Sequence, residues 1–201
     1  MVAWLMRRAI GAFERTWNYD ARYLYDILEA SPRAARLFWR VASLGQYRRD
    51  IPIEAWAAAS ITTVRHEDCG PCTQLAVTMA ERAGVSPEVL RAVLKDNPER
   101  MPADVALVWR FTRASLAHDV TADEYRDAIV TRWGPRALVS LAFAMVAARA
   151  YPSVKYALGH GKACTRLVVG GESIAVDREL SFGHGPLPTP MIADGQMPTV
   201  V

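Results

Sequence analysis

Two cysteines three positions apart, in the sequence Cys69-Gly70-Pro71-Cys72, are the residues of this chain best suited to chemistry. Thiols at this spacing can close a disulfide or share a metal ion. Inside a cell ordinary thiols stay reduced, and a persistent disulfide across so short a loop would add little stability. The pair is therefore predicted to be redox-active or to bind a metal.

The pair is expected at the start of a helix, because Gly70-Pro71 suits a first helical turn and Gly84 suits a helix end. The positive end of a helix, with its free backbone N–H groups, lowers the pKa of a thiol from its usual value of about 8.5. Cys69 lies where this field is strongest, and Cys72 lies one turn further along, on the stripe expected to face the core. The thiols can act as a nucleophile and a resolving partner, and the spacing leaves open which is which.

Acid–base help for a thiol must come from a histidine or a carboxylate within hydrogen-bond reach. His66 lies three residues before Cys69, so a continued helical turn would stack the two residues. Glu54 is an acid in an otherwise apolar segment, where a buried carboxylate would need a partner. Each also has a simpler interpretation as a polar residue on an exposed helix end or edge. Glu54 and His66 thus join Cys69 and Cys72 as candidate site residues.

A zinc site is the main competing chemistry, because His66, Cys69 and Cys72 are three candidate ligands and His160 or Cys164 could supply a fourth. Structural zinc sites usually have a second close ligand pair, and such a pair does not stand out in this sequence. A thioredoxin-like site is also disfavoured, because helical patterns rather than strands flank the cysteines. Redox chemistry is the stronger prediction.

The composition indicates one substantial domain. The chain has 201 residues, 51% of them hydrophobic, which suffices for a single core. Its net charge of +3 results from 21 Arg and 3 Lys against 21 acids, a balance that calls for neither nucleic acid nor an anionic membrane as partner. Three cysteines make no secreted disulfide framework, the N-terminus lacks a signal-peptide pattern, and the apolar run Ala137–Ala148 is too short to cross a bilayer. We expect a cytoplasmic protein.

Helix start and stop signals recur up to about residue 160. Residues 1–50 are interpreted as an N-terminal helical extension, and residues 51–163 as the helical core. An apolar helix over about Arg136–Arg149 is expected within this core, ended by Tyr151-Pro152. The extension is rich in aromatic residues that suit either a subunit interface or ordinary core, namely Trp4, Phe13, Trp17, Tyr23, Phe38 and Trp39.

The last segment, residues 164–201, has a different character. Arg166–Val169 and Ser173–Val176 flank Gly170-Gly171, a pattern typical of a β-hairpin around a glycine turn. An isolated hairpin is only marginally stable, so it is expected to dock on the helical body or on a neighbouring subunit. A tail rich in Pro and Gly follows. The fold class predicted is all-α, with a C-terminal β-hairpin and an extended tail.

Several segments resemble the alkylhydroperoxidase D and carboxymuconolactone decarboxylase family. They are Cys69–Leu94, with Ala80–Ser86 after the cysteine pair, and then Val108–Ala114 and Val120–Tyr125. The resemblance covers about residues 50–160. It implies the all-helical alkylhydroperoxidase D-like fold for this part of the chain and assembly as a homo-oligomer.

The resemblance also implies roles for the cysteines. In the redox members of the family, the residue matching Cys72 attacks a peroxide or a disulfide, the residue matching Cys69 resolves the product, and a Glu and a His relay the proton. This chain departs from the pattern, with Ala76 at the histidine position and Ala57 where spacing would put the glutamate. The two candidate acid–base residues named above are the expected replacements.

The leading hypothesis is a thiol-dependent antioxidant enzyme that reduces hydroperoxides or disulfides through its Cys-x-x-Cys pair. The sequence shows no phosphate-binding glycine loop and no flavin or nicotinamide motif, so no cofactor is expected and electrons would arrive from a dithiol reductant protein. Two alternatives stay open. One is a non-catalytic redox-sensing or interaction protein on the same scaffold, and the other is a zinc-stabilised domain.

Overall fold

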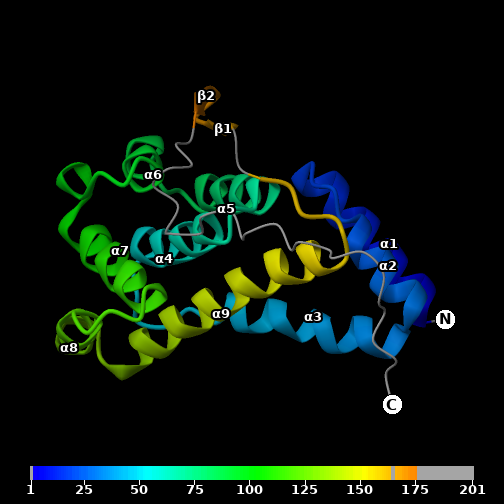
Figure 1. Cartoon of the computed structure of the whole chain (residues 1–201), viewed down its shortest axis with the longest axis horizontal. Helices are drawn as coiled ribbons and strands as arrows, with labels where there is room; N and C mark the ends of the chain where they lie inside the picture. The colour runs from blue at the N-terminus through cyan, green and yellow to red at the C-terminus, as the bar shows by residue number, and fades with distance from the viewer. Residues whose placement is uncertain (1, 164–165, 176–201) are drawn as a thin grey trace, which may run out of the picture.

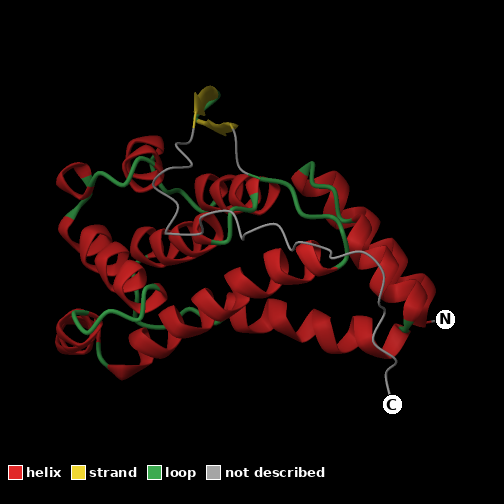
Figure 2. Ribbon diagram, viewed as in Figure 1, coloured by secondary structure: helices red, strands yellow, loops and turns green. Residues whose placement is uncertain are grey.

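The computed structural model describes residues 2–163 and 166–175, which are mostly helical (Figures 1 and 2). Within these residues, nine α-helices and one short 3-10 helix form the body, and two strands pair as an antiparallel hairpin near the C-terminal end. The predicted all-α fold class with a C-terminal hairpin is thus confirmed. The predicted tail and Cys164 lie outside the described residues.

The helices of the extension are α1 (Val2–Trp17), α2 (Arg22–Ala30) and α3 (Pro32–Gln46). Those of the core are α4 (Ile53–His66), α5 (Gly70–Arg82), α6 (Pro87–Leu94), η1 (Pro98–Arg100), α7 (Ala103–Leu116), α8 (Ala122–Trp133) and α9 (Pro135–Ala157). In Figure 1, α3 and α9 run side by side, α8 lies at the start of α9, and α1 and α2 lie near its end. The extension therefore packs against the core through α9.

Helix α4 is central to the core because its small residues let neighbouring helices approach closely. Ala55, Ala58 and Ala59 are almost fully buried, and α4 packs against α5, α7 and α9. The β-branched residues 61–64 remain helical in this setting, since burial outweighs their weak local preference for a strand. As a result α4 continues to His66, immediately before the turn that leads to the cysteine pair.

Helix α9 is longer than predicted, and the expectation that Tyr151-Pro152 ends it is wrong. The helix continues to Ala157 with Pro152 inside it. An internal proline removes one backbone hydrogen bond, and Pro152 is itself buried in the packed helix, so the turn continues despite that loss. By length and composition alone, this 23-residue helix could cross a bilayer, a test that core helices of water-soluble proteins also pass.

The hairpin consists of β1 (Arg166–Val169) and β2 (Glu172–Ala175), which pair around Gly170-Gly171 as predicted. Both glycines have positive φ, of 59° and 80°, which residues with a Cβ rarely adopt. The side chain of Gln74 in α5 holds the backbone of Val168, accepting from its N–H at 2.7 Å and donating to its carbonyl at 3.0 Å. Leu167 and Val169 are buried in the main core. The hairpin thus docks on the helical body of its own chain.

The aromatic residues of the extension divide between core and surface. Phe13 and Phe38 belong to a cluster that also contains Tyr151 of α9, with the rings of Phe38 and Tyr151 centred 5.3 Å apart. Trp4 and Trp39 are 58% and 47% exposed. The buried aromatic side chains therefore pack the extension against the core. A role for the two exposed tryptophans in a subunit interface stays a prediction.

Asp96 links three parts of the helical core through its buried carboxylate. It follows α6 with a φ of 48°. Its Oδ1 lies 2.9 Å from a guanidinium nitrogen of Arg65 in α4 and 3.3 Å from one of Arg113 in α7. The indole of Trp109 donates to the same oxygen at 3.2 Å. Removing this charge would leave two cations close together in a poorly solvated place.

We expect Asp96→Asn to lower the free energy of unfolding by about 3 kcal/mol, because it removes the charge that is paired with the buried guanidinium of Arg65. Asparagine tolerates positive φ, so the backbone turn is retained and the effect reports the charge. Urea denaturation measures it, with Asp123→Asn as control, since Asp123 and its partner Arg126 are well exposed. Equal loss in both variants would contradict the central role of Asp96.

Candidate redox site

Cys69 and Cys72 are joined as a disulfide at the start of α5, with their Cα atoms 5.3 Å apart. Cys69 is the N-cap residue and Cys72 lies in the first turn. Cys69 is fully buried and Cys72 is 5% exposed. The prediction of a pair close enough to form a disulfide at a helix start is confirmed, and the arrangement is compatible with a redox-active pair.

The local chain fixes the pair through backbone hydrogen bonds on both sides. Asp68 has a φ of 47°, which turns the chain sharply between α4 and α5. The carbonyl of Cys69 accepts from both the N–H and the hydroxyl of Thr73, each at 2.9 Å. The N–H of Gly70 donates to the carbonyl of Lys162 in the segment after α9, at 2.9 Å. The cysteines are therefore held between α4, α5 and the end of the core.

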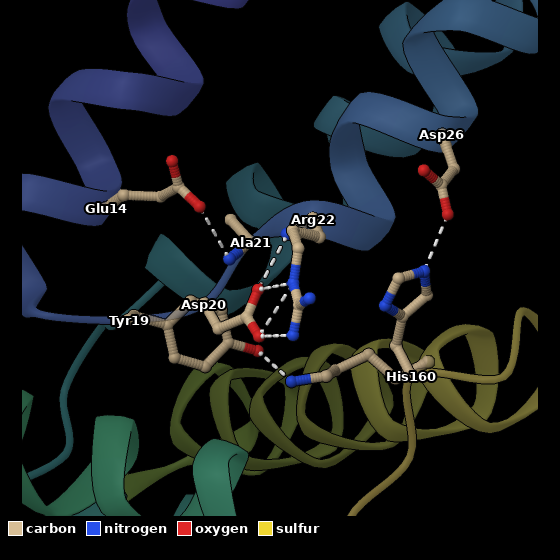
Figure 3. A network of polar contacts seen from close by, with 8 residues as sticks. Glu14, Tyr19, Asp20, Ala21, Arg22, Asp26 and His160 are labelled. Carbon is tan, nitrogen blue, oxygen red and sulfur yellow. Dashed lines mark hydrogen bonds and ion pairs between the residues drawn. The ribbon is translucent and has the colours of Figure 1, made fainter.

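A tyrosine and a lysine from distant parts of the chain complete the surroundings of Cys72. Tyr19 lies in the loop between α1 and α2, and its Oη is 3.8 Å from the Sγ of Cys72. The Nζ of Lys155 in α9 donates to the same Oη at 3.1 Å. Figure 3 shows the ring of Tyr19 with its hydroxyl directed toward α9. The extension thus supplies a side chain that contacts the cysteine pair.

Burial changes the acid–base properties of these groups. It raises the pKa of Tyr19 to about 12, although hydrogen bonding with Tyr23 works in the opposite direction. Burial also raises the pKa of Tyr23. It lowers the pKa of Lys155, which is 2% exposed, while the charge of Asp20 opposes this shift. Tyr19 therefore keeps its hydroxyl proton at neutral pH, and Lys155 gives up its proton more readily than an ordinary lysine.

An apolar cavity of about 370 Å³ opens beside Cys72. Its walls come from α1 to α5 and from α9, and most of its lining side chains are aliphatic or aromatic. Along α4 the lining runs from Ile53 to Val64, a length of about 16 Å for an α-helix. Cys72 and Tyr19 both line the cavity, whereas Cys69 does not. Cys72 is therefore the sulfur that a small molecule in the cavity would meet.

The sequence-predicted acid–base residues lie at opposite ends of α4. His66 is its last residue, near the cysteines along the chain, and Glu54 is in its first turn. About 18 Å of helix separates the two, so the structure does not bring Glu54 together with the pair. Ala57 and Ala76, where the family resemblance would place the glutamate and the histidine, both line the cavity. The alanines make that wall apolar, and the polar contact to Cys72 comes from Tyr19 instead.

Other polar residues near the pair are engaged in surface ion pairs. Glu67 accepts from Arg149 at 2.8 Å, and the Nε2 of His160 lies 2.6 Å from the carboxylate of Asp26 (Figure 3). No group of three or more His, Cys, Asp or Glu side chains that could hold a metal is found among residues 2–163 and 166–175. This part of the chain therefore offers no ligand set for the zinc-stabilised alternative.

Sequence reasoning did not identify Tyr19 or Lys155. A signal for the lysine was present, because the chain uses 21 Arg but 3 Lys, and Lys155 follows an apolar helical run. A lysine that is buried in such a place needs a polar partner for its ammonium. Tyr19 carried no comparable signal, since its contact with Cys72 spans 53 positions of sequence.

Comparisons of the chain with models of protein families, with curated proteins and with solved structures give no match.

Proposed function

We propose that this chain is a thiol-dependent oxidoreductase that reduces hydroperoxides or disulfides with Cys72 and Cys69. The observation that carries the proposal is that one sulfur of the disulfide, on Cys72, lines an apolar cavity, while the other is fully buried. A substrate in the cavity would meet Cys72 first. This supports Cys72 as the attacking thiolate and Cys69 as the resolving thiol.

With a hydroperoxide the reaction proceeds in two steps. The thiolate of Cys72 attacks the terminal oxygen, the O–O bond breaks, and the products are a sulfenic acid on Cys72 and an alcohol that takes up one proton. The thiol of Cys69 then attacks the sulfenic sulfur, forming the disulfide and releasing water. Two thiol electrons have reduced the peroxide, and the pair is left in the oxidised form that the structure shows.

The return reaction needs a reductant that supplies two electrons and two protons. A dithiol serves, because its first thiolate attacks the enzyme disulfide and its second thiol resolves the mixed disulfide. The same exchange run in reverse would reduce a disulfide substrate. We propose a dithiol protein as the partner, acting in a reducing, cytoplasmic environment.

A single-turnover experiment tests the proposal. The protein with Cys164→Ser is reduced, freed of reductant without air, and mixed with one equivalent of an organic hydroperoxide. We expect loss of two thiols and gain of one Cys69–Cys72 disulfide, followed by intact mass and peptide mapping, with one equivalent of alcohol formed. Thiols that stay reduced would refute the proposal, and oxidation that a dithiol cannot reverse would favour a redox sensor.

A further inference from the structure

Lys155 is a buried cation whose position ordinary packing does not explain. It is 2% exposed on a helix whose other buried residues are mostly small and apolar. Burying an ammonium is unfavourable unless the site compensates it. Its Nζ donates to Tyr19 and lies 4.6 Å and 5.3 Å from the ring centres of Tyr19 and Tyr23. Two aromatic faces and one hydroxyl hold the charge beside the redox pair.

The hydrogen bonds around Tyr19 have a defined direction. An ammonium can only donate, so Lys155 donates to the Oη of Tyr19. The Sγ of Cys72 has no proton while it is in the disulfide, so the Tyr19 hydroxyl is the donor in its contact with Cys72. The Oη of Tyr19 thus accepts from Lys155, and its own proton is directed to the Sγ of Cys72, 3.8 Å away.

We infer that Tyr19 is the proton donor of the Cys72 reaction and that Lys155 is a positioning residue that supplies the proton through Tyr19. The inference rests on the proposed function. It assigns the acid–base work to residues from the extension and from α9, in place of Glu54 and His66.

The proton balance of the cycle follows from this arrangement. The enzyme starts with Cys72 as thiolate, Cys69 as thiol and Lys155 as ammonium. When the O–O bond breaks, the leaving alkoxide takes the proton of Tyr19, and Tyr19 takes one from Lys155, which becomes neutral. The thiol proton of Cys69 leaves with hydroxide as water when the disulfide forms. The two protons of the reducing dithiol then restore the Cys69 thiol and the Lys155 ammonium.

The electrostatic surroundings suit a lysine that changes charge during the cycle. The carboxylate of Asp20 acts on Lys155, but Arg22 holds Asp20 in an ion pair at 2.6 Å. The titratable or charged groups that contact or act on the ammonium are Tyr19, Asp20, Arg22, Tyr23 and Lys162, and Tyr151 acts in turn on Tyr19. No carboxylate among these residues binds Lys155 directly, so its charge is available to stabilise the Cys72 thiolate.

The test uses a protein in which Cys72 is the single thiol, made by Cys69→Ser and Cys164→Ser. Alkylation of Cys72 by iodoacetamide is followed against pH, since the thiolate is the reactive form. We expect Tyr19→Phe and Lys155→Met each to shift the midpoint of this profile upward by about one pH unit. Tyr25→Phe and Lys95→Met are the matched controls and should leave it unchanged.

A second readout separates the relay from the proposed function. With both cysteines present, Tyr19→Phe is expected to slow hydroperoxide reduction at neutral pH by about a hundredfold, the usual range for loss of a general acid. Shifted alkylation profiles without any peroxide reduction in the parent would uphold the coupling of Tyr19 and Lys155 to the Cys72 thiolate and refute the peroxidase. If the parent reduces peroxide but the alkylation profiles of the variants coincide with that of the parent, only the assignment of Tyr19 and Lys155 is overturned.

Folding is checked in the same variants. Tyr19→Phe keeps the ring that packs with Phe13, so its helical circular dichroism should match the parent. Lys155→Met removes a buried charge and is expected to unfold at the same or a higher temperature. A purely structural role for Lys155 would instead lower the unfolding temperature and leave the Cys72 pH profile unmoved, which would also overturn the assignment.

Discussion

Cys72→Ser is expected to reduce the kcat/KM for an organic hydroperoxide by at least about a thousandfold, the scale seen when an enzyme loses its nucleophile. A serine hydroxyl does not ionise near neutral pH, and it cannot form the sulfenic acid on which the reaction depends. Since Cys72 is the cysteine that lines the cavity, Cys69 should not replace it. Steady-state peroxide consumption with a dithiol reductant measures the loss.

Cys69→Ser is the matched variant, with a different expected outcome. The first step needs only Cys72, so one equivalent of hydroperoxide should still react and leave a sulfenic acid that a dimedone adduct identifies by mass. Turnover then stops or becomes slow, because the buried resolving thiol is gone. If Cys72→Ser keeps the first step and Cys69→Ser loses it, the two roles are reversed and the access argument from the cavity is wrong.

Both variants are expected to keep the fold of the parent protein, which circular dichroism measures. Each removes the disulfide but keeps a side chain of similar size, and the turn that leads into α5 depends on backbone bonds to Thr73 and Lys162 rather than on sulfur. The helical content should therefore persist. A collapse of structure in both variants would show a structural disulfide, which is the outcome least compatible with a redox cycle.

The parts of this structure that the sequence predicted are those set by local rules. Gly70-Pro71 starts a helix because proline fits a first turn, and Gly170-Gly171 forms a hairpin because it supplies two positive φ angles. The placement of Cys72 on a buried face follows from the helical period. Each of these features needs only a few neighbouring residues, so a single sequence contains the information.

The parts that the sequence did not predict depend on packing between distant segments. The hydrogen bond from Lys155 to Tyr19 joins residues 136 positions apart. Whether α9 ends at Pro152 depends on what buries the next turn, which a local proline rule cannot include. Glu54 drew attention as an acid in an apolar segment, yet its distance from the pair emerged only when the full length of α4 was known.

The cavity shows the same limit. Ala57 and Ala76 looked like losses of two catalytic residues when compared with the family pattern. In three dimensions they belong to a wall shared with aliphatic and aromatic side chains from the extension, which widens an apolar space next to Cys72. Small residues in a helix are compatible with close packing and with a cavity. Which of the two forms depends on how the surrounding helices are placed.

This apolar space predicts a strong preference for substrates with an aliphatic chain. Each methylene moved from water into an apolar site tightens binding about fourfold. An n-octyl hydroperoxide has four methylenes more than n-butyl hydroperoxide, so its kcat/KM should be about 250-fold higher, with hydrogen peroxide lower still. The series is measured with one reductant at fixed concentration, so that differences report the peroxide step.

Filling the cavity should remove this preference without harming the chemistry. Ala57 lines the cavity about one turn into α4. Ala57→Leu is expected to lower the kcat/KM for the octyl substrate about tenfold and to change that for hydrogen peroxide little, because the small peroxide needs only the space beside Cys72. Ala142→Leu, on the exposed side of α9, is the matched control. Equal rates along the peroxide series in the parent protein would show that the cavity does not hold the substrate chain, whatever the cysteines do.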